Sequence, residues 1–219
     1  MLQIINREFV LFELKKMPYS EKYNSILGYT RMVEDFAPKL VKKELGKEKA
    51  DELRGTWEKR VEPISKDASD KDKYEVAYRN FMWKWVSANK LMDTYQGEHG
   101  KRKYMEAAIA AWKRKYRYGI AVEVVGSLSR KRAFRILAKR LAYQLQAFSP
   151  FSVSELKENR MVLTVTPCKI LTDKNGISFC TMACQNIIPS WLEAQFNIKM
   201  NPNRNGTNCV VVFEPFSSL

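Results

Sequence analysis

The sequence is poor in the residues that most metal and acid–base sites require. It has one histidine in 219 residues and no cysteine before Cys168. A single histidine excludes a helical bundle that holds two metals through several histidines. It also leaves His99 as the only imidazole for a Ser-His-Asp or Cys-His arrangement. Because His99 stands between Gly97 and Gly100, we expect it in a surface loop rather than in a catalytic centre.

Common ligand-binding motifs and long apolar runs are absent too. The chain contains no H-E-x-x-H, no G-x-x-x-x-G-K-[ST] and no G-x-G-x-x-G. No segment approaches the roughly 18 uninterrupted apolar residues of a membrane span. Charged residues also interrupt residues 1–17 too often for a signal peptide. We therefore predict a cytoplasmic protein without membrane insertion, whose cysteines are reduced.

The residues that are present describe a folded chain that begins with helices. Hydrophobic residues make up 45% of the sequence and aromatic residues 12%. Apolar side chains recur at three- and four-residue steps through most of residues 1–148, which predicts helices. We expect these helices over about 20–36, 38–62, 73–95, 102–124 and from 129 onward. Ser20 and Asp70 are predicted caps, Pro38 a predicted helix start, and Gly97 and Gly100 a predicted helix end.

The pattern changes at Ser149-Pro150. Residues 160–166 and 209–214 alternate between apolar and polar or smaller side chains, as strands with one buried face do. Residues 181–196 fit a helix packed on a sheet, and Pro189 should bend or restart that helix. The prediction is an α+β protein with two domains. A helical domain over 1–148 precedes a module over 149–219, in which a small antiparallel sheet and a packed helix carry every cysteine.

Four cysteines crowd into this module with the spacing C-x11-C-x3-C-x24-C: Cys168, Cys180, Cys184 and Cys209. Four thiolates that converge from strand ends and a helix start would suit an iron–sulfur cluster or, alternatively, zinc. The spacing lacks the C-x2-C pairs of zinc ribbons, so a thiol redox pair and simple buried cysteines stay open. If the helix begins near Thr181, Cys180 and Cys184 lie at its N-terminus, where its dipole favours thiolates.

A basic block suggests a partner. Residues 101–140 contain thirteen lysines and arginines against two acids, in a chain of net charge +14. The block could meet an anionic ligand, nucleic acid, a protein partner or another copy of the chain, or it could be a solvated helix face. Aromatic residues within it could stack on bases: Tyr104, Trp112, Tyr116 and Tyr118. The candidate anion- or partner-binding residues are Arg130, Lys131, Arg132, Arg135, Lys139 and Arg140.

The C-terminal region resembles a known group of domains. The residues that carry the resemblance are Glu158-Asn159-Arg160-Met161-Val162-Leu163-Thr164-Val165-Thr166-Pro167-Cys168, Gly176-Ile177-Ser178-Phe179-Cys180, Phe196-Asn197, and Cys209 before a Val/Phe strand. They resemble bacterial and archaeal proteins related to L-2-amino-thiazoline-4-carboxylate hydrolases and, more distantly, to 4-vinyl reductase domains. Residues 44–50 also look like a helix start of that group.

The resemblance covers about 60 residues and implies a helical part followed by a cysteine-bearing α+β module. Only Cys168, Cys180 and Cys209 match the group by position. Cys184 stands where the group tends to have a small residue, and residues 201–205 replace an extra cysteine pair. Beside a metal-binding protein that acts with a larger partner, the resemblance implies a hydrolase of C–S or C–N bonds with a cysteine nucleophile, Cys180 or Cys184.

Overall fold

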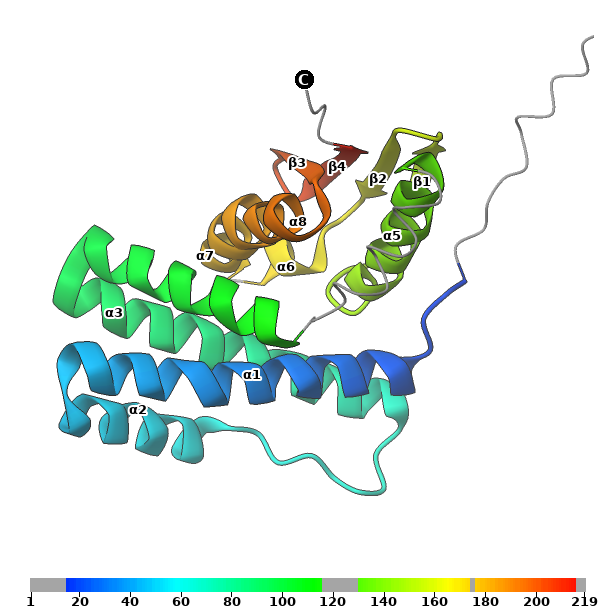
Figure 1. Ribbon diagram of the computed structural model, residues 1–219. Coiled ribbons are helices and arrows are strands. Elements are labelled where there is room, and N and C mark those ends of the chain that lie inside the picture. Colours follow the sequence, from blue (N-terminus) through cyan, green and yellow to red (C-terminus); the bar gives the residue numbers. More distant parts are fainter. Residues whose placement is uncertain (1–14, 116–129, 174–175, 216–219) are drawn as a thin grey trace, which may run out of the picture.

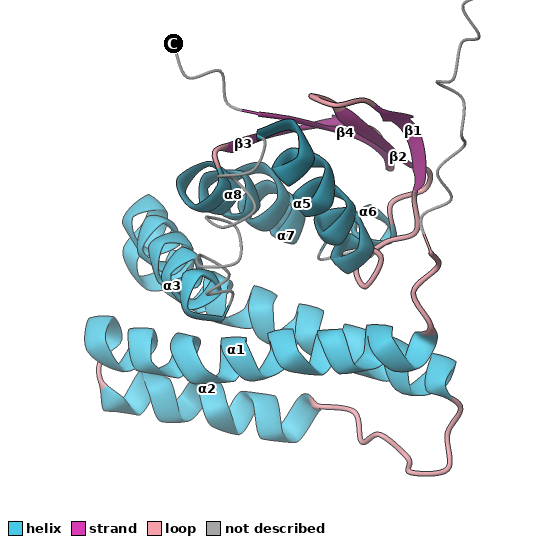
Figure 2. Cartoon of the chain, turned by 45° about the vertical axis from the view of Figure 1, so that its right-hand side comes forward, coloured by secondary structure: helices cyan, strands magenta, loops and turns pink. Residues whose placement is uncertain are grey.

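The computed structural model describes residues 15–115, 130–173 and 176–215, and it shows an α+β protein. Two long helical hairpins form one side of the molecule, and a four-stranded antiparallel sheet lies on the opposite side (Figures 1 and 2). Short helices near the C-terminus lie between these two layers and contact both. The predicted fold class, a helical part followed by a small sheet with a packed helix that carries cysteines, is confirmed.

The N-terminal layer is made by α1 (Tyr19–Leu45), α2 (Lys47–Arg60) and α3 (Asp70–Lys115). The expected start of a new helix at Pro38 is wrong, because Pro38 lies buried inside α1. The expected cap at Ser20 is also wrong, since α1 begins after Pro18 and no side chain caps it. The cap of α3 is displaced by one residue from the prediction: the Ser69 hydroxyl accepts the Asp72 backbone N–H at 3.2 Å.

The long helix α3 folds back on itself at Gly97. Gly97 adopts φ 56° and ψ −141°, a left-handed conformation that an L side chain would strain. The chain therefore reverses at the predicted punctuation point, and the second half of α3 returns along the first (Figure 1). The predicted loop around His99 is nevertheless wrong, because helix resumes immediately after Gly97 and includes His99.

The C-terminal part begins with α5 (Arg130–Leu145) and two strands, β1 (Ser152–Leu156) and β2 (Met161–Val165). The short helix α6 (Lys169–Thr172) follows, and then α7 (Gly176–Phe179), the π-helix η1 (Cys180–Ile187) and α8 (Ile188–Phe196) succeed one another without a break. A hairpin of β3 (Ile198–Asn205) and β4 (Asn208–Pro215) completes the sheet, in the order β1-β2-β4-β3. Strands β2 and β4 confirm the two predicted strands, and Pro189 sits in the first turn of α8, where a helix restart was expected.

Aromatic side chains join the two layers. The Phe179 ring contacts Phe81, Trp85 and Phe148, with centroid distances of 5.6, 5.2 and 5.9 Å. Trp85 and Phe179 are at most 1% exposed, and they belong to one continuous core that runs from α1 to the sheet. Because Phe179 immediately precedes Cys180, this cluster fixes the start of the cysteine-bearing helix against α3.

Candidate functional site

All four cysteines line one small cavity between the sheet and the helices η1 and α8. The cavity has a volume of about 60 Å³, and its other lining residues are apolar except for Ser149. Each of the four cysteines is free of disulfides. The four cysteines therefore lie close together in the fold, as their grouping in the sequence predicts.

The sheet supplies two of the four thiols. Cys209 lies on β4 directly opposite Val165 of β2, on the buried face of the sheet. Cys168 follows the end of β2, and its backbone N–H donates to the Thr207 carbonyl at 2.7 Å. This bond ties the segment after β2 to the turn between β3 and β4. The thiols of Cys168 and Cys209 are thereby held at the same end of the sheet.

The π-helix supplies the other two thiols. Cys180 and Cys184 lie four residues apart in η1, so their side chains share one side of the helix. Pro189 has no N–H to donate to the Gln185 carbonyl, and the preceding turns are wound wider than an α-helix. The Asn186 side-chain amide donates instead to the Thr181 carbonyl at 2.6 Å. Such π-helical segments occur frequently at functional sites.

The close approach of the first residue of α7 to the backbone of α6 requires a glycine. A Cβ atom on Gly176 would lie 1.5 Å from the Ile170 carbonyl oxygen of α6, so no larger residue fits there. Helix therefore begins at Gly176, four residues before Cys180. The expectation that Cys180 and Cys184 occupy a helix N-terminus is wrong, because helix already runs from Gly176 through Phe179 into Cys180.

The acidity of Cys180 comes from its neighbours. A hydrogen bond from the Cys184 thiol, together with the Arg204 guanidinium, lowers the pKa of Cys180 to about 7 against the opposing effect of burial. The same pairing raises the pKa of Cys184 well above its usual range. Burial raises the pKa of Cys209 to about 11. The cavity therefore holds one acidic thiol, Cys180, whose proton-bearing neighbour is Cys184.

Arg204 was not found from the sequence. It lies on β3 directly opposite Cys209, so the β3–β4 hairpin brings its guanidinium to the cysteine cavity. The two-residue turn between Asn205 and Asn208 sets this register. Asn-Gly at residues 205–206 signals a hairpin, but the turn residues are Gly206 and Thr207. A two-residue turn at Asn205-Gly206 would have paired Arg204 with Thr207, so the sequence signal predicts the hairpin without the register that places Arg204 opposite Cys209.

A half-buried amine, that of Lys169, anchors the site to α3. Lys169, the residue after Cys168, forms an ion pair with Glu75 at 2.6 Å and lies over the rings of Tyr74 and Tyr78, 4.2 and 4.4 Å from their centroids. Burial lowers the pKa of Lys169, although the Glu75 carboxylate opposes this effect. The contact holds α6 and the adjacent Cys168 against the helical layer.

The cavity is not a preformed metal centre. Among residues 15–115, 130–173 and 176–215, no three histidine, cysteine, aspartate or glutamate side chains form a group that could hold a metal ion. The Cys209 sulfur instead approaches the Val210 carbonyl oxygen at 3.9 Å.

No family model, curated protein or solved structure matches the chain. The resemblance to the aminothiazoline-carboxylate hydrolase group therefore stays a prediction. Within the described ranges, no helix is both long enough and apolar enough to cross a bilayer.

The other predicted site residues lie away from this cavity. Tyr104 and Trp112 are buried in the core, with 0% and 4% exposure, so the prediction that they stack on bases is wrong. Tyr116 and Tyr118 lie outside the described residues. His99 is exposed on α3, and its Nδ1 lies 3.0 Å from the Arg102 guanidinium.

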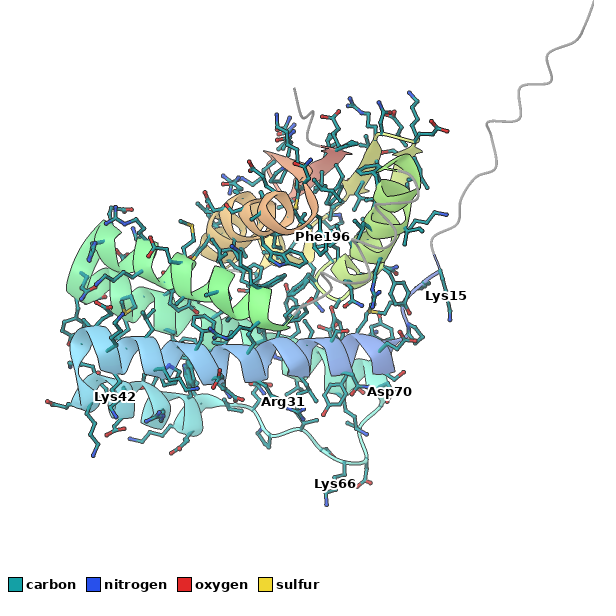
Figure 3. All side chains as sticks on the ribbon, in the orientation of Figure 1. Lys15, Arg31, Lys42, Lys66, Asp70 and Phe196 are labelled. Atoms are coloured by element: carbon teal, nitrogen blue, oxygen red, sulfur yellow. The ribbon has the colours of Figure 1, made fainter. Side chains whose placement is uncertain are left out.

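The proposed basic surface belongs mostly to α5. The backbone of Arg130–Leu145 is helical, but the side chains of Arg130, Lys131, Arg132 and Arg135 lie outside the described part, while Lys139 and Arg140 do interact with neighbours. Exposed lysines and arginines also project from other elements, among them Lys15, Arg31, Lys42 and Lys66 (Figure 3). Positive charge is therefore distributed over several faces, and the role of the α5 block stays a prediction.

Proposed function

We propose that the protein carries out thiol–disulfide exchange, with Cys180 as the attacking thiolate and Cys184 as the resolving thiol. The observation that carries this proposal is the arrangement of Cys180: one helical turn from Cys184, beside Arg204, on the wall of an apolar cavity. Exchange requires a thiolate at neutral pH and a second thiol within reach. Although Cys180 is 4% exposed, its neighbours Thr181 and Arg204 are exposed, so the thiol lies just beneath the surface.

The chemistry follows from these two groups. The Cys180 thiolate attacks one sulfur of a disulfide substrate, and the other sulfur leaves as a thiolate that takes up a proton. Cys184 then loses its proton, attacks the Cys180 sulfur of the mixed disulfide, and releases the second substrate thiol. The protein is left with a Cys180–Cys184 disulfide, and the substrate has been reduced by two electrons. Arg204 stabilises the negative charge on Cys180 before the attack.

The cavity favours exchange over hydrolysis of C–S or C–N bonds. Hydrolysis needs a general base that activates water. None of the residues that line the cavity is a histidine, aspartate or glutamate. Disulfide exchange requires no activated water, so it uses the groups that are in place. A cytoplasmic location, which keeps Cys180 and Cys184 reduced between cycles, belongs to the same proposal.

A second candidate function is the binding of a soft metal ion. One observation favours it: all four cysteines, from the segment after β2, from η1 and from β4, reach the same cavity. Thiolates select zinc or iron–sulfur clusters. No set of metal-ligating side chains is preformed in the described residues. Metal binding would therefore have to draw Cys168 and Cys209 toward Cys180. Metal analysis of protein purified without oxygen tests it, and about one zinc or iron site per chain, lost in Cys168→Ser, would favour this function.

The pH dependence of alkylation tests the exchange proposal. We expect iodoacetamide to label one thiol with a midpoint near pH 7, and we expect Cys180→Ser to abolish this fast phase. At pH 7 the labelling rate of Cys180→Ser should be about tenfold below that of the wild-type chain, because the remaining ordinary thiols are only a few per cent ionised there. Cys209→Ser is the matched control and should leave the fast phase intact, since the pKa of Cys209 is about 11.

Two outcomes would contradict the proposal. The first is labelling without any midpoint below about pH 8, which is typical of unperturbed thiols. The second is a fast phase that persists in Cys180→Ser. Mass spectrometry after oxidation with a small disulfide supplies the complementary readout, because exchange predicts a bond between Cys180 and Cys184 rather than a bond to Cys209.

A further inference from the structure

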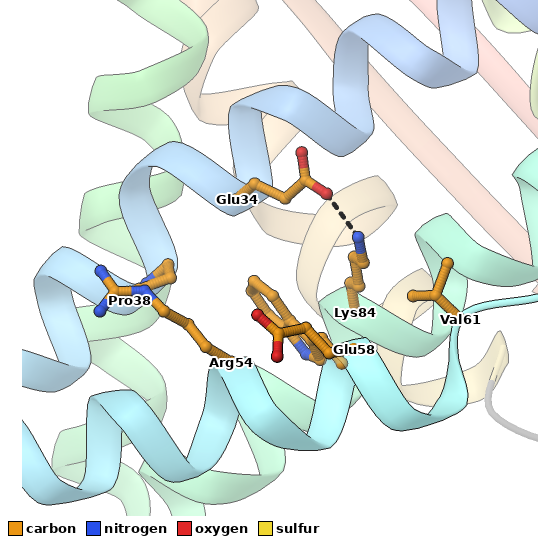
Figure 4. Close-up of a pocket in the computed structure, with 7 residues that line it drawn as sticks. Glu34, Pro38, Arg54, Glu58, Val61 and Lys84 are labelled. Carbon is orange, nitrogen blue, oxygen red and sulfur yellow. Dashed lines mark hydrogen bonds and ion pairs between the residues drawn. The ribbon is translucent and has the colours of Figure 1, made fainter.

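A second cavity lies in the helical layer, far in sequence from the cysteines. Its volume is about 470 Å³, within the range of about 300–1,000 Å³ that is usual for small-molecule sites. Three helices contribute to it, and its wall contains Glu34 and Pro38 of α1, Arg54, Trp57 and Glu58 of α2, Lys84 of α3, and Val61 at the end of α2 (Figure 4).

The two positive side chains of this wall are already paired. Lys84, only 10% exposed in its side chain, forms an ion pair with Glu34, which Figure 4 marks with a dashed line. The Lys84 ammonium also lies 5.6 Å from the centroid of the Trp57 ring. Arg54 donates to Asp51 of the preceding turn at 3.1 Å. Both cations therefore have a carboxylate partner within the protein.

Glu58 is the charged side chain of the wall that is left without an ion pair. No ion pair joins its carboxylate to another of the described residues. The cavity also adjoins the C-terminal end of α2, where the last helix carbonyls carry partial negative charge. The nearby Arg60 guanidinium is engaged elsewhere, 3.9 Å from the centre of the Trp83 ring. The four ionisable side chains of the wall balance, two acids against two bases, and among them Glu58 alone has no ion pair with another of the described residues.

The apolar part of the wall is rigid. Trp57 donates its indole N–H to the Ser87 hydroxyl at 2.8 Å, which fixes the ring between α2 and α3. Pro38 and Val61 supply further apolar surface on either side of it. A ligand therefore meets a carboxylate and a helix C-terminus at one part of the wall and carbon surface at the other.

We propose that this cavity binds a small organic cation, a primary amine carried on an apolar body. The ammonium group would pair with Glu58 near the end of α2, and the body would lie against Trp57, Pro38 and Val61. Carboxylate ligands are disfavoured, because they would meet the unpaired Glu58 carboxylate and would compete with Glu34 for Lys84. This site is independent of the cysteine cavity, and its test does not depend on thiol chemistry.

Three ligands with the same phenyl body and different charges test the proposal: phenethylamine, phenylalanine and 3-phenylpropionate. Binding to the full chain is followed through the indole N–H signal of Trp57 in a nitrogen-15 NMR spectrum, assigned with Trp57→Phe. We expect the amine to shift this signal with a dissociation constant in the range of about 1 mM or below. It should bind about tenfold more tightly than the carboxylate, with the zwitterion between them.

The charge assignment is tested with two variants of α2. Glu58→Gln should weaken amine binding about two- to fivefold, the effect of one partly exposed ion pair. Glu48→Gln, at the other end of α2 and exposed, should leave the dissociation constant unchanged. Equal or tighter binding of phenylpropionate would overturn the proposal, as would an amine affinity that Glu58→Gln does not change. A Trp57 signal that none of the ligands shifts at about 10 mM would also overturn it.

Discussion

The cavity at Trp57 and the cavity at Cys180 both hold ionisable side chains, but they surround them differently. At Trp57, Lys84 and Arg54 each have a carboxylate partner. At Cys180 the lining is almost entirely apolar, and one thiol, one neighbouring thiol and one guanidinium determine the charge. A polar wall suits reversible binding by charge, whereas an apolar wall makes each remaining electrostatic contact stronger. The apolar cavity therefore shifts the pKa of Cys180, whereas the polar cavity at Trp57 can bind a charged ligand.

The aromatic cluster at Phe179 connects the cysteine cavity with the helical layer, and removing it should have the largest effect. Phe179 is 1% exposed and contacts aromatic rings of α3 and of the segment after α5. We expect Phe179→Ala to lower the free energy of unfolding in urea by about 3–5 kcal/mol. Phe196→Ala is the control, since this half-buried ring packs on Trp191 and should cost less.

The same variant separates the two cavities. Phe179 directly precedes Cys180, so Phe179→Ala should move the pH midpoint of Cys180 alkylation away from 7. Amine binding at Trp57 should stay unchanged. Equal damage at both sites would mean that the helical layer and the cysteine cavity behave as a single cooperative structure, contrary to this expectation.

Opposite pH dependences are expected within the cysteine cavity itself. The pKa of Cys180 is lowered in the folded state, so its contribution to stability is complete above about pH 9 and is lost as the pH falls to about 7. The pKa of Cys209 is raised to about 11, so its contribution is present below about pH 9 and is lost as the pH rises to 11.

Urea unfolding of two alanine variants measures this difference. The stability advantage of the wild-type chain over Cys180→Ala should grow between pH 7 and 9, whereas its advantage over Cys209→Ala should shrink between pH 9 and 11. Groups shared by both variants cancel in these differences. Two parallel slopes would show that the environments of Cys180 and Cys209 do not differ as proposed.

Periodicity was sufficient for the broad fold and for the neighbourhood of the cysteines. Helical spacing predicted most of α1 to α3, and alternation predicted β2 and β4, since both patterns arise from burial on one face. Caps were less predictable. Pro38 continues α1 because tertiary packing overrides its local preference. Ser69 caps α3 rather than Asp70, because an N-cap side chain accepts a backbone N–H up to three residues later and Ser69 stands three residues before Asp72.

The chemistry of the site depends on contacts that the local pattern does not contain. Cys180 and Arg204 are distant in the sequence, and only the register of the β3–β4 hairpin brings them together. Likewise Glu34, Trp57 and Lys84 meet because α1, α2 and α3 pack side by side. Pairings between helices depend on rotation about each helix axis, which an apolar stripe defines too coarsely to place single charges.

Removing single ion pairs of the helical layer should change the free energy of unfolding least. Two such pairs, one exposed and one enclosed, allow a direct comparison. The fork of Arg79 on Glu62, with distances of 3.0 and 2.6 Å, is about half exposed. Glu62→Gln should therefore cost about 0.2–1 kcal/mol in urea unfolding, and less at high salt. Glu34→Gln should cost more, because it leaves the enclosed Lys84 ammonium without its carboxylate.

The pH dependence of the Glu62 pair provides the internal check. The Arg79 hydrogen bond lowers the pKa of Glu62, so its contribution is present above the ordinary pKa of a carboxyl and disappears as the pH falls through the lowered value. The difference between the wild-type chain and Glu62→Gln should therefore vanish in acid. If it persisted there, the loss would come from packing of the side chain and not from its charge, and exposed pairs of this layer would be poor guides to its electrostatics.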